Sequence, residues 1–314
     1  MNKWGGPVLL ALPVPDLLER TPDSTMQPTL VLLAKHATRI LLITLAGGFL
    51  ALALARLAPG FGVDEREFDT RLSEDTRAAI RQSHDSERNI FHFYFTWLRG
   101  LAHGELGVSP SLNQPVRQLL ADRLPVTIKL LAWGLLVGWG MGFGLAVPLA
   151  FVRGRAYELG ANALATLFLC VPAAVLALFF LLTRSPSALV VGLVIFPKVF
   201  RYARTLLRQT AALPHVLTAR AKGLSNIRVF LWHYLPPAAP QWLALLAVSL
   251  SLALSAAVPV EVVCDLPGIG QLAWKAAMAR DMYLLVCLTG IVTLATVMAK
   301  SASELLGESF RMQA

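Results

Sequence analysis

Five long runs of uncharged, mainly apolar residues restrict what this chain can fold into. They cover residues 40–55, 130–152, 159–183, 234–260 and 282–299. A helix needs about 20 mostly apolar residues to cross the hydrocarbon core of a bilayer. Only 15% of the chain is charged, whereas a soluble domain carries about 25% charge, and the mean hydropathy is +0.60. We therefore expect an all-α integral membrane protein.

A sixth span comes from a shorter uncharged segment, 185–197. Continued to about Leu206, it is long enough to cross the bilayer. Loops that remain in the cytoplasm are rich in Lys and Arg. Six spans with a cytoplasmic N-terminus place Arg153, Arg155 and the 197–233 loop inside. Five spans would place one of these basic segments outside, so we expect about six transmembrane helices.

The 197–233 segment is strongly basic and contains no carboxylate. Its cations are Lys198, Arg201, Arg204, Arg208, Arg220, Lys222 and Arg228. This loop supplies most of the net charge of +9, so the charge indicates membrane topology rather than nucleic-acid binding. A long basic loop between two spans suggests a docking surface for a cytoplasmic partner, and the alternative is a segment that binds lipid headgroups.

Small and polar residues within the spans suggest packing and pathway roles. Gly134, Gly138 and Gly142 recur every four residues, a spacing that lets helix backbones approach closely in lipid. Ser251 and Ser255 share one helix face and are candidates for lining a pathway, together with Asn162, Thr166 and Ser249. Ordinary interhelical hydrogen bonding is the alternative for each of these polar side chains. Pro148 and Pro172 can kink their helices.

Catalytic, nucleotide-binding and metal-binding patterns are missing from the sequence. No phosphate-binding loop with a Gly-Lys-Ser/Thr ending occurs, and no acidic residue lies within the six runs. The cysteines and the histidines of the outer segment lack metal-ligand spacing; they are Cys170, Cys264, Cys287, His84, His92 and His103. We expect a non-catalytic membrane subunit that binds no cofactor and no metal.

One motif in the basic loop carries a family resemblance. Residues 218–225 read TARAKGLS, and Leu235-Pro236 follow at a fixed distance from Gly223. This pattern resembles the cytoplasmic signature of permease subunits in ABC importers for peptides and nickel. The resemblance assigns the contact with the ATPase to Thr218, Ala219, Arg220, Ala221, Lys222, Gly223, Leu235 and Pro236.

Two further motifs are similar to the same family. Residues 265–270 read DLPGIG, and Arg280-Asp281 precede the last span. These segments resemble the family's outer loop, and make Pro267, Gly268, Gly270, Arg280 and Asp281 candidates for an external gate. A purely structural turn is the alternative. Arg56 to Gly60, Gly104 to Gly107 and Pro115 to Thr127 resemble the first helix and outer segment of dipeptide-type permeases.

The resemblance implies the fold and the activity of a type I ABC importer permease. Such a chain would form the translocation pathway for peptides or a related small solute, such as a nickel complex. Its partners would be a second permease subunit, two cytoplasmic ATP-binding subunits and an external solute-binding protein. It would lie in the cell inner (plasma) membrane, with both termini cytoplasmic. The alternative function is a self-contained channel or ion-coupled carrier.

The expected organisation has five parts. They are an N-terminal extension at 1–35, a first transmembrane helix at 36–57, an external segment with amphipathic helices at 58–125, a transmembrane permease core at 126–305 with a cytoplasmic coupling loop at 207–236, and a cytoplasmic tail at 306–314. The extension is expected to be cytoplasmic; a signal peptide is the alternative, because Lys3 precedes a short apolar run.

Overall fold

The computed structural model describes residues 23–57, 90–151 and 154–313. Its elements, in chain order, are α1 (Asp23–Leu57), α3 (Ile90–Ala102), β1 (Val108–Ser109), β2 (Gln114–Pro115), α4 (Val116–Phe151), α5 (Arg155–Cys170), α6 (Ala173–Leu182), α7 (Ala188–Ala211), α8 (Pro214–Ala221), α9 (Asn226–Val229), the π-helix η2 (Phe230–Tyr234), α10 (Ala239–Val263), α11 (Ile269–Met278) and α12 (Met282–Gln313). Within those ranges the protein is helical apart from one small antiparallel hairpin, β1–β2. The chain divides into two units, 1–39 and 40–314, and α1 begins in the first and continues into the second.

Four of the described helices are long and apolar enough to cross a membrane by themselves. They are Val31–Leu57, Val116–Leu149, Ala239–Val263 and Met282–Glu308. The residues expected to form the first transmembrane helix, 36–57, lie within α1, which begins at Asp23. The described structure includes only a small part of the expected extension at 1–35, and 58–89 of the external segment lie outside the described residues.

The run 159–183 is sharply bent at Pro172, where the sequence allowed a kink. This run forms α5 and α6, two helices that meet at a bend of 94° and count as a fifth span only if the bent pair crosses as one. Val171 and Pro172 form the break, with the backbone of both extended. A proline lacks the N–H that would continue the helical ladder, and it also forces the preceding residue out of the helical region.

The segment expected to form the sixth span is helical, as α7, but its composition differs from that of the four helices recognised as spans. At 24 residues it is about 36 Å long, which is enough to cross a bilayer. It is not among the helices that are apolar enough to be recognised as spans. The reason is that one of its faces is polar, while the rest of the helix is buried in the larger hydrophobic core.

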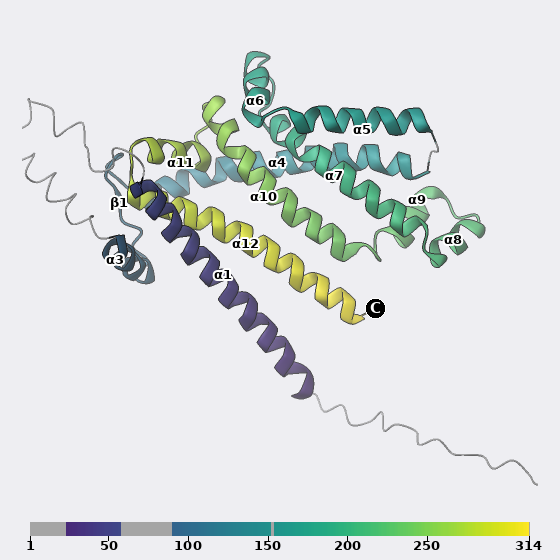
Figure 1. The fold of residues 1–314 in the computed structure, drawn as a ribbon, viewed down its shortest axis with the longest axis horizontal. Helices are drawn as coiled ribbons and strands as arrows, with labels where there is room; N and C mark the ends of the chain where they lie inside the picture. Colours follow the sequence, from purple (N-terminus) through teal and green to yellow (C-terminus); the bar gives the residue numbers. More distant parts are fainter. Residues whose placement is uncertain (1–22, 58–89, 152–153, 314) are drawn as a thin grey trace, which may run out of the picture. The chain divides into compact units, whose positions relative to one another are not determined.

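Helix α7 packs closely along α4, as the glycine spacing predicted (Figure 1). A Cβ on Gly134 would lie 2.5 Å from Val191, one on Gly138 would lie 2.9 Å from the Gly192 carbonyl oxygen, and one on Gly142 would lie 2.6 Å from Val199. Side chains larger than hydrogen would separate the two backbones. The prediction that these glycines serve helix packing is confirmed.

The second unit has two ends, each with its own group of short elements. Helix α7 leads into α8, α9 and η2 before the chain returns through α10 to α11 (Figure 1). A second hydrophobic core lies near α11, where α1, α3, the first turns of α4, and α12 meet. The motifs predicted from the sequence are therefore divided between the α8 end and the α11 end.

Candidate functional site

Helix α8 contains the first half of the loop motif 218–225, and residues 222–225 follow its last turn. Pro214 stands in its first turn, where a backbone N–H has no helical partner to lose. Val216 and Ala219 are buried against the larger core. The opposite side of the motif is exposed, and it presents Thr218, Arg220, Ala221, Lys222 and Gly223. The helix is thus fixed on one face and open on the other.

Gly223 follows the C-terminal end of α8 and terminates this helix. The Leu224 N–H donates to the Ala219 carbonyl at 3.3 Å, and the Gly223 N–H donates to the Arg220 carbonyl at 2.9 Å. This pair of bonds is the Schellman motif, which needs a left-handed residue after the helix. Gly223 adopts φ +74°. No described atom lies within 4 Å of a Cβ placed there, so backbone conformation, not space, favours glycine.

Two contacts hold α8 against the π-helix η2. Arg220 Nη2 donates to the Tyr234 hydroxyl at 2.7 Å, and His215 Nε2 lies 3.2 Å from the His233 carbonyl oxygen. Burial raises the pKa of the Tyr234 hydroxyl, and Arg220 partly opposes that effect. The hydroxyl therefore stays protonated at neutral pH. Leu235 closes η2 by donating to the Phe230 carbonyl at 3.1 Å.

The α8–η2 surface also exposes several large apolar side chains. Leu217 is 55% exposed, Ile227 72% and Trp232 72%, and they occur with exposed Arg220 and Lys222. Exposed apolar groups with charged neighbours mark contact surfaces for proteins or membranes. We refer to Leu217, Arg220, Lys222, Ile227 and Trp232 as the α8 surface.

At the other end, a fully buried carboxylate organises the loop between α10 and α11. Glu261 has no exposed surface and lies in the last turn of α10. Its Oε2 accepts the Gly270 N–H at 2.6 Å and the Gln271 N–H at 3.2 Å, while its Oε1 accepts the Thr127 hydroxyl at 2.7 Å. Thr127 Oγ1 in turn accepts the Ile269 N–H at 2.8 Å. The first N–H groups of α11, which lack helical partners, are thereby satisfied.

Glu261 was not among the residues predicted from the sequence, and Thr127 was named only as the end of the family-like segment Pro115 to Thr127, without a role. Thr127 lies in α4, far from the DLPGIG motif along the chain, so only the fold brings the two together. Glu261 directly follows the uncharged run 234–260. A carboxylate at the end of a span and before a Pro-Gly turn was the available signal.

Two of the predicted loop glycines are required by this buried carboxylate. A Cβ on Gly268 would lie 2.2 Å from the Glu261 carboxyl group. A Cβ on Gly270 would lie 2.7 Å from Val258 Cα and 3.0 Å from Glu261 Oε2. The absence of a side chain at Gly270 therefore allows the backbone of α11 to approach α10 closely. Pro267 precedes these glycines in the turn between α10 and α11.

Asp281 joins the β1–β2 hairpin to α12. Its Oδ1 accepts the Leu284 N–H at 3.1 Å, the bond of a helix N-cap. Its Oδ2 accepts hydrogen bonds from the hydroxyls of Ser109 and Ser111, the latter at 2.7 Å. Arg280 adopts φ +55°, and this left-handed residue turns the chain from α11 into α12. Arg280 and Asp281 therefore form a structural corner at the outer end.

The polar side chains proposed for a pathway have local hydrogen-bond partners. Ser251 and Ser255 donate to carbonyl oxygens one turn earlier in α10, at 3.1 and 3.0 Å. Asn162 Oδ1 and Thr166 Oγ1 accept from Arg204 and Arg201 across the α5–α7 contact, at 3.1 and 2.8 Å. Asn162 and Thr166 therefore form the interhelical hydrogen bonds that were the alternative to lining a pathway.

The structure brings the predicted coupling-loop residues together near α8 and the predicted gate residues together near α11. The two sets of residues lie at opposite ends of α10. Helix α10, which connects their two ends, has 25 residues and is about 38 Å long. Any communication between the ends must pass through the packed helices. Within the described residues, no three His, Cys, Asp or Glu side chains form a group that could hold a metal ion.

Comparisons with known proteins agree on one family. A family model described as "Binding-protein-dependent transport system inner membrane component" matches residues 134–311. A putative peptide transport system permease protein of Brucella suis biovar 1 (strain 1330) is 30% identical over 212 residues, which cover 59% of this chain and 68% of the relative. The oligopeptide transport system permease protein OppB of Escherichia coli (strain K12) is 26% identical over 260 residues, covering 76% and 84% of the two chains.

Proposed function

The chain belongs to the family of binding-protein-dependent transport system inner membrane components, and from this we propose that it forms part of the pathway of an ATP-driven peptide importer. The observation that carries the proposal is the α8 surface. A short helix with a buried face is joined through Ala212 and Leu213 to α7. Its other face exposes apolar and basic side chains at the motif that resembles the family's ATPase contact.

The α8 surface has the chemistry of a docking site for a cytoplasmic ATPase. Leu217 and Ile227 would enter an apolar groove of the partner, and Arg220 and Lys222 would supply polar contacts at its rim. The Schellman turn at Gly223 sets the direction in which the chain continues after α8. A movement of α8 would pass directly into α7, because only two residues link the helices. A movement of packed helices of this kind can switch a transporter between two conformations.

The outer loop is proposed as the external gate of the same pathway. Glu261 holds α11 on the end of α10, and Asp281 holds the β1–β2 hairpin on α12. These two carboxylates would make the outer segments move as units with their spans. Pro267, Gly268, Gly270, Arg280 and Asp281 would then shape the gate without binding solute directly.

The proposed assembly contains a second permease subunit, two cytoplasmic ATP-binding subunits and an external solute-binding protein. Peptides are the favoured substrate class, because the named relatives are peptide and oligopeptide transport permeases. Nickel complexes are the second candidate substrate. The protein would lie in the inner membrane with both termini in the cytoplasm. A channel or carrier that works alone is the competing function.

Co-purification of an ATPase separates these functions. Leu217→Glu places a carboxylate on the exposed face of α8, where folding tolerates it but an apolar partner groove does not. We expect the variant to reach the membrane. The amount of co-purifying ATPase and the rate of ATP-dependent peptide uptake should each fall at least tenfold.

Leu112→Glu is the matched control at the opposite end, since Leu112 is 38% exposed beside the β1–β2 hairpin. It should retain the ATPase. If ATPase recovery is the same for Leu217→Glu and the unmodified chain, the assigned docking surface is wrong. Transport by the purified chain without any ATPase would instead support the channel or carrier.

A further inference from the structure

Helix α7 carries a polar stripe on an otherwise buried helix. Lys198, Arg201, Tyr202 and Thr205 are exposed, and their spacing places them on one helix face. The intervening Val199, Phe200 and Ala203 are among the most deeply buried residues of the larger core. A membrane helix that faced lipid would have the opposite pattern. This stripe therefore faces water, a ligand or another polar surface.

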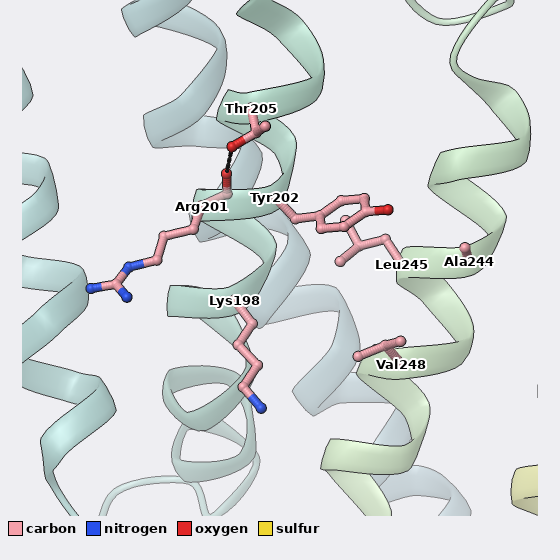
Figure 2. Close-up of a pocket in the computed structure, with 7 residues that line it drawn as sticks. All are labelled: Lys198, Arg201, Tyr202, Thr205, Ala244, Leu245 and Val248. Atoms are coloured by element: carbon pink, nitrogen blue, oxygen red, sulfur yellow. Dashed lines mark hydrogen bonds between the residues drawn. The ribbon is translucent and has the colours of Figure 1, made fainter. Parts of the chain in front are cut away.

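A cavity of about 340 Å³ lies over this stripe, between α7 and α10. Its lining is Lys198, Arg201, Tyr202, Thr205, Ala244, Leu245 and Val248. Figure 2 shows the Tyr202 ring extending from α7 towards α10 and the Lys198 side chain extending along α7. The Arg201 guanidinium points to the other side of α7, where Nη2 donates to Thr166 Oγ1 at 2.8 Å. Of the two cations that line the cavity, Lys198 is thus the one whose head group is not directed at α5.

The charges of α7 differ in what they contact. Arg204 and Arg208 both form ion pairs with Glu158 of α5, the second at 2.7 Å. No described carboxylate lies within ion-pair distance of the Lys198 ammonium group. Residues 197–211 of the basic segment expected to be a loop are helical, and Lys198 lies near the middle of the 24-residue helix. An ammonium group held against a packed apolar core needs water or an anion to compensate its charge.

The α10 wall of the cavity continues along the expected pathway. Ala244 and Val248 share a helix face with Ser251 and Ser255, because the four positions repeat at helical spacing. The two serines lie further towards the α11 end of α10. One face of α10 therefore carries Ser251 and Ser255 towards α11, and Ala244 and Val248 where it lines the cavity beside Lys198.

We propose that Lys198, assisted by the Tyr202 hydroxyl, binds the carboxylate of a peptide during its passage between α7 and α10. The proposal rests on the proposed function of peptide import. The ammonium group offers three donors to a carboxylate, and the phenol one more. Leu245 and Val248 supply an apolar wall that accepts many side chains. A single lysine also holds an anion less rigidly than a bidentate arginine does, which suits a solute that must leave.

Protection of a cysteine from labelling tests this site without relying on transport. Val248→Cys places a thiol on the cavity wall, in a chain whose native Cys170, Cys264 and Cys287 are replaced. The full transporter is labelled with a maleimide in membranes. We expect Ala-Ala and N-acetyl-Ala-Ala to slow labelling, and the amide Ala-Ala-NH₂ to have no such effect, because only the first two carry a free carboxylate.

Substitutions of Lys198 decide whether this residue is the anion partner. Lys198→Gln should raise the dipeptide concentration for half-protection about tenfold, the typical value of a charge-assisted hydrogen bond. Lys198→Arg should retain protection. Lys300→Gln, the matched lysine substitution in α12, should have no effect.

The site is overturned if the amide protects as well as the free peptide, if Lys198→Gln leaves half-protection unchanged, or if no peptide protects. Labelling that depends on phosphatidylglycerol content and not on peptide would make the cavity a lipid headgroup site instead. Carboxylate-dependent protection without ATP-driven peptide uptake would uphold the site and refute the proposed importer.

Discussion

Two buried carboxylates at the outer end are held by backbone N–H groups at helix N-termini. Glu261 accepts from the first turn of α11, and Asp281 caps α12. These N–H groups lack partners within their helices and carry partial positive charge. A charged side chain becomes stable there without a neighbouring cation. Such residues have structural roles that a charge count cannot reveal, because the compensating donors belong to the backbone.

Glu261→Gln is expected to destabilise the outer end by about 2 kcal/mol, since it replaces charge-assisted hydrogen bonds with weaker neutral ones and directs an amide N–H₂ at groups that already donate. The apparent melting temperature of the purified protein in detergent should fall. Glu105→Gln is the matched control, because Glu105 is exposed. Equal melting temperatures for Glu261→Gln and the unmodified chain would contradict this account.

Five of the described helices end in the same backbone arrangement but with different residues. The left-handed position after the helix is occupied by Gly104 after α3, Arg184 after α6, Gly223 after α8, Asp265 after α10 and Arg280 after α11. Each shows the two bonds of the Schellman motif. The α3 and α8 termini use glycine, which adopts positive φ without steric cost. The other three termini carry a side chain in a conformation that L-residues disfavour.

Arg184→Gly should therefore stabilise the protein by about 0.5–1 kcal/mol, because the conformation is unchanged and its steric cost disappears. Arg184 is exposed at the α6–α7 turn, so little packing is lost. Gly223→Ala tests the same reasoning in reverse and should cost about 1 kcal/mol. Chemical denaturation in a mild detergent measures both changes. A loss of stability in Arg184→Gly would show that its side chain, not its backbone, matters.

The elements differ in how far the sequence predicted them. The α4–α7 contact was predictable, since Gly134, Gly138 and Gly142 mark a close approach by spacing alone. The break at Pro172 was recognised only as a kink, because sequence cannot tell a tolerated proline from a 94° turn. The segment of α7 has the shortest uncharged run, because Lys198 ends it, and the sequence alone did not show that the charges beyond this point lie on one face of a single helix. The Glu261–Thr127 contact was missed, because it depends on which spans are neighbours.

At the scale of the whole molecule, α7 connects every proposed site. Its last turn leads to α8, its polar stripe forms one wall of the cavity, and its opposite side interlocks with α4. Helix α4 also carries Thr127, which accepts the Ile269 N–H of the outer loop. A displacement of α8 would therefore reach both the cavity and the outer loop through one rigid contact. Packed helices of this kind change position as units, because close-packed interiors deform little.

Loosening the α4–α7 contact should uncouple the two ends while leaving the ATPase bound. Gly138→Ala places a Cβ 2.9 Å from the Gly192 carbonyl oxygen and 3.0 Å from Ile195, so α7 must shift. We expect at least a tenfold loss of peptide uptake, with the ATPase still co-purifying and still hydrolysing ATP. Gly140→Ala, two residues along α4, meets no described atom within 4 Å and should transport normally. Because the α8 surface is untouched in both variants, loss of the ATPase from Gly138→Ala would mean that the helix contact supports docking rather than transmission.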